Sequence, residues 1–442
     1  MKHLVTVFLT FIAAIAPVHA QDAVEIVFNG STATYTIPSS VKGVSIGKNG
    51  AKVTVTCTNT TTEYTYRVSG SSDNGSLTIN ADYKLTLQLA GLTLTNAKGG
   101  ATIDVECGKR IDVVLEDGTV NTIADSNLGS QKAAFYTKGH AEFSGGGTLN
   151  VTGLKKHAIC TKEYCELKAN TGTINILGAL GDGIHCGKGK VKDENNYFLM
   201  KGGTLNIAGI ADDGIDSDDY GTLTIEDGTV SISVPDGGIG LKADSTVTIS
   251  GGKVSIDVPG KDSKAIRANY AVNIAGGENN LIVSGDGSKG IKGNKNVTGA
   301  KVLNGGNVNI SGGVTSIIVS GGNIITSTDG VADTTKCMGI SVDANLTQTD
   351  GTVTITLKGS EARSYNVKGT ETLSGGTLTV VNDDVTVLTG DVNNDGTVDV
   401  ADISSIINHM AGNMLYDDAD VNADGTVDIA DISAVIRIMA EQ

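Results

Sequence analysis

The sequence predicts an all-β fold, a parallel β-helix with about 25 residues in each coil, followed by a small α-helical domain. Three observations predict it. A strand-and-glycine unit recurs through most of the chain, glycine is abundant (59 residues) while proline is scarce (4), and helix-period patterns are confined to about the last fifty residues. A recurrence of this length is typical of a solenoid.

The recurring unit begins with a glycine pair followed by an alternating strand. Its best copies are G-G-T-L from Gly202, G-G-K-V from Gly251, G-G-N-V from Gly305 and G-G-T-L from Gly375. The large step after Gly306 predicts one irregular extra copy near Gly321-Gly322. The glycine that closes each unit is found at Gly118, Gly147, Gly172, Gly203, Gly228, Gly252, Gly277, Gly306, Gly351 and Gly376.

One coil can be read from residues 239–256. Alternation places Val247, Ile249, Val254 and Ile256 on one face of two short strands, and a third short strand surrounds Leu241. Three short strands in about 25 residues make one coil, whose apolar face lies inside and whose edges bond to the coils above and below.

These patterns divide the chain into four segments, the last of which is the small α-helical domain over 390–442. Residues 1–20 read as a secretory signal peptide that is cleaved after Ala20, because Lys2 precedes a short apolar stretch and a small-residue site. Residues 21–80 are expected to form a β cap or the first coils, and 81–385 the parallel β-helix. No later stretch is apolar and long enough for a membrane span, so the sequence predicts a secreted, extracellular protein.

Charge and cysteine content exclude some functions. The formal net charge is −16, and residues 390–442 carry eleven acids and one base, a net −10. Nucleic acid is not an expected partner, because no basic surplus neutralises phosphates. None of the six histidines forms a metal-binding pair in the sequence, and the cysteine spacing does not indicate zinc. Cys160, Cys165 and Cys186 fall on adjacent coils, where either one local disulfide or buried thiols is possible.

The tail contains one acidic motif twice, 29 residues apart. Each copy has oxygen-bearing side chains at loop positions 1, 3, 5, 9 and 12, a carbonyl ligand at position 7 and glycine at position 6, which suits Ca2+. Short apolar helices are expected to follow, over 403–410 and 432–439. The predicted calcium ligands are Asp391, Asn393, Asp395, Thr397, Asp399 and Asp402 in the first loop, and Asp420, Asn422, Asp424, Thr426, Asp428 and Asp431 in the second.

Residues 390–442 resemble a type I dockerin, on both loops, the aspartate at position 12 and the short helices. The resemblance implies a calcium-folded module that attaches to a cohesin-bearing scaffold protein. Positions 10 and 11, which help to set partner choice in dockerins, are Val400-Ala401 and Ile429-Ala430 here, not the common hydroxyl pairs. A calcium-stabilised tail without a cohesin partner is the alternative.

A second marker, an apolar residue followed by a polar one, recurs in each coil. In a parallel β-helix, equivalent positions stack about 4.8 Å apart. The markers are Phe135, Ile159, Ile184, Ile215, Leu241, Ile266, Ile291 and Ile340. The residues after them form a predicted outward column of Tyr136, Cys160, His185, Asp216, Lys242, Arg267, Lys292 and Ser341. The residues two before them form the column Ala133, His157, Asp182, Asp213, Ile239, Lys264, Lys289 and Met338.

Both columns change from acidic to basic along the chain. Dense carboxylates repel one another unless a cation lies between them, so the sequence predicts calcium at Asp182, Asp212, Asp213, Asp216 and Asp218. A solvated acidic turn is the alternative. The stacked cations Lys242, Lys264, Arg267, Lys289 and Lys292 suit an anionic polysaccharide such as polygalacturonate. A charge ladder that only balances the acidic coils is the alternative.

The body, from about Ala81 to Val380, is similar to secreted right-handed parallel β-helix carbohydrate-binding domains with a pectate-lyase-like fold. The likeness depends on the D-D-G-I-D-S-D run from Asp212, the L-K-A-D run from Leu241 and the G-G-T-L strands. It implies calcium and a plant cell-wall polysaccharide, acidic pectin-like or cellulosic, as ligands of a non-catalytic binding protein.

Two other functions stay open at this stage. A calcium-dependent polysaccharide lyase would use Asp213, Asp216 and Asp218 with Lys242 or Arg267 as the base. A structural or adhesive rod would bind no sugar tightly. No Trp is present, and of the aromatic residues only Tyr136, Tyr197, Tyr220 and Tyr270 are well placed to contact sugar, which favours a hydrated acidic ligand over crystalline cellulose.

Overall fold

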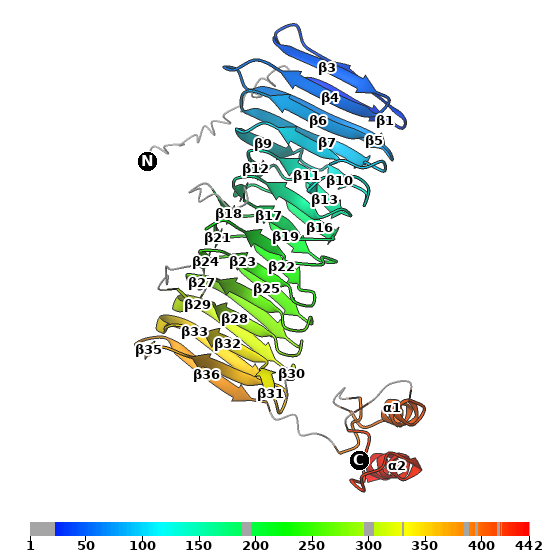
Figure 1. The fold of residues 1–442 in the computed structure, drawn as a ribbon, viewed down its shortest axis with the longest axis vertical. Coiled ribbons are helices and arrows are strands. Elements are labelled where there is room, and N and C mark those ends of the chain that lie inside the picture. The colour runs from blue at the N-terminus through cyan, green and yellow to red at the C-terminus, as the bar shows by residue number, and fades with distance from the viewer. Residues whose placement is uncertain are drawn as a thin grey trace, which may run out of the picture. The chain divides into compact units, whose positions relative to one another are not determined.

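The computed structural model describes residues 23–187, 196–295, 305–328, 331–383, 389–393, 397–412, 416 and 418–441. The predicted signal peptide lies outside the described residues. The chain divides into unit 1, residues 1–209 with 217–221, and unit 2, residues 210–216 with 222–442. Both units are all-β apart from two helices near the C-terminus (Figure 1).

In unit 1, successive strands pair in parallel with the strands of the next coil rather than with their sequence neighbours. β11 pairs with β14, β12 with β15 and β13 with β16, so three strands succeed one another before the pattern returns. The strands are β1 (Val24–Asn29), β2 (Thr32–Thr36), β3 (Val44–Asn49), β4 (Lys52–Cys57), β5 (Tyr64–Ser72), β6 (Ser76–Ala81), β7 (Leu85–Thr95), β8 (Ile103–Glu106), β9 (Arg110–Leu115), β10 (Val120–Ala124), β11 (Ala133–Thr137), β12 (His140–Ser144), β13 (Thr148–Gly153), β14 (His157–Thr161), β15 (Cys165–Leu167), β16 (Thr173–Ala179), β17 (Ile184–Cys186), β18 (Tyr197–Met200) and β19 (Thr204–Ile207).

Unit 2 uses the same parallel pairing. β23, β26, β28, β32 and β34 follow one another in one sheet, and β24, β25, β27, β29 and β33 pair in the other. The strands are β21 (Thr222–Ile225), β22 (Thr229–Ser233), β23 (Ile239–Ala243), β24 (Thr246–Ile249), β25 (Lys253–Val258), β26 (Lys264–Ala268), β27 (Ala271–Val283), β28 (Lys289–Gly293), β29 (Asn307–Val319), β30 (Ile324–Thr328), β31 (Val331–Thr335), β32 (Met338–Val342), β33 (Leu346–Leu357), β34 (Arg363–Val367), β35 (Glu371–Leu373) and β36 (Thr377–Asn382). The short β20 (Ile215–Ser217) is divided between the two units.

The first strands of unit 1 are paired differently from the rest. β1 and β2 form an antiparallel hairpin, as do β3 and β4, before β4 pairs in parallel with β6 and β1 with β5. The hairpin partners hydrogen-bond to the outer edges of β1 and β4. These two strands therefore do not present an open edge for another chain to pair with.

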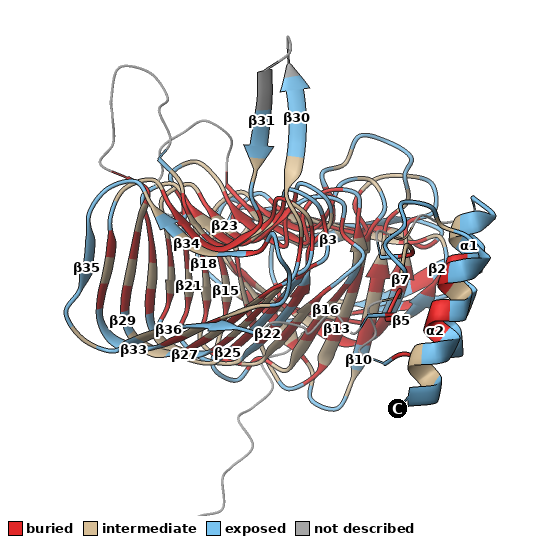
Figure 2. Ribbon diagram, turned by 90° about the horizontal axis from the view of Figure 1, so that it is seen from below, coloured by how far each residue is buried: buried red, intermediate tan, exposed pale blue. Residues whose placement is uncertain are grey.

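The apolar faces predicted from alternation lie in the core. Val247, Ile249, Val254 and Ile256 are each at most 1 % exposed. Every marker residue from Phe135 to Ile340 named above is likewise buried. Figure 2 shows the same alternation of buried and partly exposed residues along the strands.

The glycine pairs close turns that other residues would strain. Gly252 and Gly277 have φ of 76° and 78°, and a Cβ on Gly252 would lie 2.6 Å from the carbonyl oxygen of Gly228 in the preceding coil. Only glycine adopts this conformation without cost and leaves that space open.

Two of the predicted copies of the glycine-and-strand unit are wrong. The register joins Ala275 to Gly312 and Glu278 to Val314, so Gly312-Gly313, rather than Gly305-Gly306, takes the turn position. The residues after Gly321-Gly322 are not an extra copy, because β30 and β31 form an antiparallel hairpin of their own. An inserted hairpin has the same glycine-and-alternation pattern as a coil, and only its pairing distinguishes the two.

The helices α1 (Val400–Met410) and α2 (Ile429–Glu441) begin three residues earlier than expected. Asp399 caps α1: its side chain accepts a hydrogen bond from the backbone N–H of Ala401, and Asp402 accepts one from the N–H of Asp399, which completes a capping box. The helices share a small core in which Ile406 and Val435 are fully buried. Neither they nor any other helix among the described residues is long and apolar enough to cross a membrane.

Candidate functional site

The strand register confirms the side-chain columns within each unit. In unit 1 it joins Tyr136 to Cys160 and Cys160 to His185. In unit 2 it joins Lys242 to Arg267, Arg267 to Lys292, and Lys292 to Ser341, and in parallel Ile239 to Lys264, Lys264 to Lys289 and Lys289 to Met338. Cys160 lies in the first column between the larger Tyr136 and His185 and is fully buried there.

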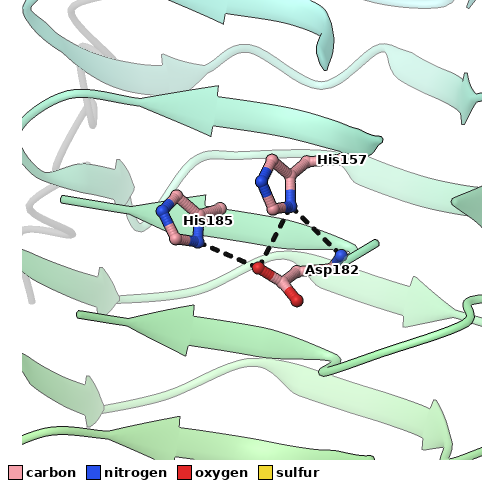
Figure 3. A group of neighbouring side chains, drawn as sticks. All are labelled: His157, Asp182 and His185. Carbon is pink, nitrogen blue, oxygen red and sulfur yellow. Dashed lines mark hydrogen bonds and ion pairs between the residues drawn. The ribbon is translucent and has the colours of Figure 1, made fainter. Parts of the chain in front are cut away.

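In unit 1 the columns bring two imidazoles and a carboxylate together (Figure 3). The Nδ1 atoms of His157 and His185 lie 3.0 and 2.9 Å from the same oxygen, Oδ2 of Asp182. The two rings are stacked with centroids 4.4 Å apart. His157 and Asp182 are 3 % exposed, and burial lowers the pKa of His157 against the opposing effect of the Asp182 carboxylate.

The sequence analysis did not predict the group of His157, Asp182 and His185, although all three residues belong to the predicted columns. His157 and Asp182 occupy the same position in successive coils, and His185 is the residue after the marker Ile184. A search for histidines three or four residues apart along one helix cannot find a pair that belongs to two strands. Of the predicted calcium ligands, the structure therefore places Asp182 among nitrogen donors.

In unit 2 the acidic residues meet a lysine. Nζ of Lys242 lies 2.8 Å from Oδ2 of Asp213 and 3.0 Å from Oδ2 of Asp216. Asp213 also accepts a hydrogen bond from the backbone N–H of Ile239 at 2.8 Å. Burial disfavours the charged amine, but the two carboxylates outweigh burial and raise the pKa of Lys242. The lysine is therefore held as a cation.

The other predicted calcium ligands of the body lie near these groups. Asp212 is exposed in unit 2, directly before the buried Asp213. Asp218, in unit 1, is half-buried and its backbone N–H donates to the carbonyl of Cys186 at 3.0 Å.

The remaining cations of the predicted polysaccharide site follow the register of β26 and β28. Lys264 pairs with Asp262 at 3.0 Å and Lys292 with Asp343 at 2.8 Å. Arg267 donates to Oδ1 of Asn269 at 3.4 Å. The charges are thus on one strand face, and two of them are balanced within unit 2.

Lys289 differs from the other cations of this face. Its amine donates to the carbonyl of Gly287. Burial, with the nearby charge of Lys264, lowers the pKa of Lys289 to about 8. Its charge therefore changes close to neutral pH.

An aromatic stack lies on β12, β15 and β18 of unit 1. The rings of His140 and Tyr164 are stacked at 4.2 Å, and those of Tyr164 and Tyr197 at 4.5 Å. The Tyr164 hydroxyl donates to Oε1 of Glu142 at 2.6 Å. Of these rings the sequence had singled out only Tyr197. Because Tyr164 is stacked on both faces, neither of its faces is available to a ligand.

The other tyrosines expected to contact sugar do not join this stack. Tyr220 and Tyr270 are 59 % and 49 % exposed and lie on turns, while Tyr136 is half-buried in its column. All six cysteines are buried free thiols, the second of the two possibilities that the sequence left open.

The second acidic loop of the tail is folded around its own carboxylates. Oδ1 and Oδ2 of Asp420 accept hydrogen bonds from the backbone N–H groups of Asp424 and Gly425 at 3.1 and 2.9 Å. Asp431, fully buried, accepts from the N–H groups of Asn422 and Asp428 at 3.1 and 2.8 Å. The loop is therefore closed by hydrogen bonds from its own backbone to these two carboxylates.

The first loop repeats part of this arrangement. Asp402 is fully buried and accepts from the backbone N–H groups of Val392, Asn393 and Asp399 at 2.7, 3.0 and 2.8 Å. Asp391 is 2 % exposed. Thr397 belongs to the described residues, whereas Asp395 lies outside them. A set of acidic and amide oxygens held by the backbone, with its first and last carboxylates buried, fits a hard cation such as calcium.

Comparison with known proteins agrees with this organisation. Residues 49–264 match a family model described as carbohydrate-binding domain-containing protein, and residues 389–440 match the type I dockerin domain. The chain combines a carbohydrate-binding domain with a type I dockerin. A solved polysaccharide lyase-like protein from C. thermocellum, a gadolinium derivative, is 18 % identical, with a TM-score of 0.32 over 80 % of this chain and 99 % of its own. None of the curated proteins matches the chain.

The dockerin presents equivalent apolar side chains from its two helices. Val400 and Ile429, which hold loop position 10 in the two copies, are 67 % and 72 % exposed. Ile407 and Ile436, seven residues further along each helix, are 51 % and 53 % exposed. Each helix therefore has buried residues in the shared core, and Figure 2 shows buried and exposed segments on both helices. The exposed segments include the apolar pairs Val400 with Ile407 and Ile429 with Ile436.

Proposed function

We propose that this chain is a secreted, non-catalytic protein that holds a plant cell-wall polysaccharide on a right-handed parallel β-helix, and that its dockerin attaches it to a cohesin-bearing scaffold. The observation that carries the proposal is the presence of both domains in one chain. One domain recognises carbohydrate and the other serves attachment. Residues 1–20 act as a signal peptide that exports the protein.

The polysaccharide lies along the strand face of β23, β26 and β28. Stacked strands repeat polar side chains about every 4.8 Å. At this spacing an extended polysaccharide can repeat the same contact along the strand face. Lys242, Lys264, Arg267, Lys289 and Lys292 supply the donors. Since Lys242, Lys264 and Lys292 already have carboxylate partners, Arg267 and Lys289 contribute most to the attraction of an acidic, pectin-like chain.

Calcium has two proposed places in the protein. In the dockerin, both loops supply the ligands, and calcium stabilises the folded loops and helices because the site does not exist in the unfolded chain. In the body, Asp182 and Asp218 of unit 1 and Asp212, Asp213 and Asp216 of unit 2 are proposed calcium ligands. At Asp213 and Asp216 a calcium ion has to displace the Lys242 amine.

A polysaccharide lyase is the alternative function, and the charge state of Lys242 argues against Lys242 as its base. A lyase base has to be neutral to take the proton beside a uronate carboxylate. Lys242 is held charged by Asp213 and Asp216, with a raised pKa. The second alternative is a structural or adhesive rod that binds no sugar.

The dockerin surface indicates the kind of scaffold contact. Exposed apolar residues at position 10 of both loops suit an apolar patch on a cohesin rather than hydroxyl-mediated hydrogen bonds. The partner is then a cohesin that lacks polar groups opposite Val400 or Ile429.

Affinity electrophoresis in gels that contain polygalacturonate, together with a cellulose pull-down, tests the main proposal. We expect retardation by at least one of the polysaccharides, weakened by Arg267→Gln with Lys289→Gln. Lys253→Gln is the matched control, because Lys253 belongs to an exposed pair with Glu278. Migration that no tested polysaccharide changes would instead favour a structural or adhesive rod.

Two further measurements separate the alternatives. Incubation with polygalacturonate and calcium gives no ultraviolet absorbance from unsaturated sugar ends if the protein is a binder, whereas steady product formation would establish a lyase. A chelator should remove the helix signal of residues 390–442 and leave the β signal. Helix content that does not respond to the chelator would contradict calcium binding by the dockerin.

A further inference from the structure

We propose that His157, Asp182 and His185 form a binding site for a divalent transition metal, with zinc as the reference ion. The three side chains are all in unit 1, on β14, β17 and the turn before β17. This inference is independent of the polysaccharide-binding function and of the calcium loops of the tail, and at Asp182 it competes with the calcium proposed above.

Three ligand atoms converge in the group. A ring nitrogen of each histidine and a carboxylate oxygen of Asp182 lie within 4.8 Å of one another. Both Nδ1 atoms approach the same oxygen, Oδ2, at 2.9 and 3.0 Å (Figure 3). Ligand atoms bound to one ion at 2.0–2.2 Å have to be neighbours of this kind.

The protons at His157 do not account for its contacts. Nδ1 of His157 lies 3.0 Å from Oδ2 of Asp182 and 3.1 Å from the backbone nitrogen of the same residue. To accept the amide proton, Nδ1 needs its lone pair, and to donate to the carboxylate it needs a hydrogen, so one nitrogen cannot serve both. If Nδ1 accepts the amide proton, no hydrogen lies between it and Oδ2, and a cation bound by both atoms would relieve their repulsion.

The donor set selects the type of metal. Imidazole nitrogen is a ligand for zinc, copper, nickel and iron, whereas calcium prefers oxygen alone. Two imidazoles and one carboxylate also leave a further coordination position for water or a ligand, as in zinc sites with three protein ligands. The calcium predicted at Asp182 from the sequence did not take the two imidazoles into account.

Two of the three ligands lie on strands, and the third, Asp182, lies in the short turn before β17. Ile159 is in register with Ile184, and Ala158 donates its backbone N–H to the carbonyl of Asp182 at 3.2 Å. His157 and Asp182 are 3 % exposed, and His185 is partly open. Ligands fixed in this way lose little conformational entropy on binding, and the exposed side of His185 leaves a path for the ion.

The test uses tag-free, full-length mature protein. It is stripped with a chelator, returned to excess calcium so that the dockerin loops are filled, and titrated with zinc against a chromophoric zinc indicator. We expect about one zinc ion per chain and, with Co2+, an absorption spectrum of a nitrogen- and oxygen-ligated ion. Asp182→Asn, His157→Gln and His185→Gln should each weaken binding by about tenfold or more.

His140→Gln is the matched control. His140 also contacts a carboxylate, with Nδ1 2.6 Å from Oε2 of Glu163, but its stacking partner is Tyr164 rather than a second imidazole. This variant should bind zinc as the unmodified protein does. Circular dichroism shows whether the His157 and His185 variants fold, and Asp182→Asn, which preserves size, keeps the test valid if they do not.

Two results would overturn the proposal. One is no zinc binding by the calcium-replete protein. The other is binding that His140→Gln and Asp182→Asn weaken equally, since that would place the ion elsewhere. In either case the three residues are a buried hydrogen-bonded group without a metal.

Discussion

Asp182 and Asp213 occupy the same position of their coils, two residues before a buried marker isoleucine, yet their surroundings differ. Asp182, in unit 1, meets the imidazoles of His157 and His185. Asp213, in unit 2, meets the amine of Lys242. Both carboxylates are 3 % exposed. The backbone therefore buries an acid at each place, and the neighbouring coil decides what compensates it.

The difference determines what each group can bind. The amine of Lys242 gives two carboxylates a counter-charge that belongs to the protein itself. The imidazoles offer nitrogen lone pairs, which a metal can use. In unit 2 the counter-charge thus comes from a lysine of the chain, whereas in unit 1 the proposed zinc ion would supply it.

The largest expected effect comes from removing the lysine. Lys242→Met leaves Asp213 and Asp216 buried without their counter-charge, which should lower the free energy of unfolding by about 3–5 kcal/mol. Urea unfolding at pH 7 measures it. The loss should shrink as the pH is lowered, because protonated carboxylates no longer need the amine.

Lys253→Met is the control for that change. Lys253 and Glu278 form an ion pair whose side chains are 71 % and 67 % exposed, so its loss should cost less than about 1 kcal/mol. Equal destabilisation by the two substitutions would mean that burial does not distinguish Lys242, and the contrast with Asp182 would fail.

The next effect compares the two carboxylates directly. Asp213→Asn removes one of two charges that hold Lys242 and should cost about 1–3 kcal/mol, whereas Asp182→Asn, beside two imidazoles, should cost about half as much. Thermal unfolding of metal-free protein gives the ranking. Zinc should then raise the stability of Asp213→Asn but not of Asp182→Asn. The reverse order of stabilities would show that Asp182, not Asp213, depends on a fixed cation.

Lys289 extends the comparison to a buried amine that burial, rather than carboxylates, controls. With a pKa of about 8, it is charged below that pH and neutral above it. Polygalacturonate stays ionised from pH 7 to 9, so its affinity should fall about three- to fivefold over that range. Affinity electrophoresis at the two pH values measures the change. Lys289→Gln should remove the pH dependence, and a dependence that persists in this variant would assign it to another group.

The columns could be predicted from the sequence because the spacing of the markers fixes the register of parallel strands. Lys242, Arg267 and Lys292 fall into line for that reason. The partners inside each group could not be predicted, because Asp213 is reached by a side chain 29 residues later, whose direction depends on packing. The inserted hairpin at β30 and β31 was misread for a related reason, since an insertion copies the local pattern but not the pairing.

The dockerin loops were the easiest part to predict, and the aromatic stack the hardest. Each loop contains its proposed calcium ligands within twelve residues, so their spacing is visible in the sequence. Tyr164 precedes a buried cysteine in a short strand, and nothing local to it indicates that His140 and Tyr197 stack on its two faces. Contacts across coils are visible only once the register is known.

The smallest expected effect concerns a carboxylate with one charged and one neutral partner. Glu142 is paired with Lys168 at 2.7 Å and accepts the Tyr164 hydroxyl at 2.6 Å. Tyr164→Phe removes only the neutral donor, and because Lys168 still compensates the charge, unfolding should become easier by about 0.5–1.5 kcal/mol. Tyr220→Phe, at a 59 % exposed ring, should change nothing measurable. A loss with Tyr164→Phe as large as that with Lys242→Met would mean that neutral donors hold buried carboxylates as firmly as lysine does, and the distinction between the two units would disappear.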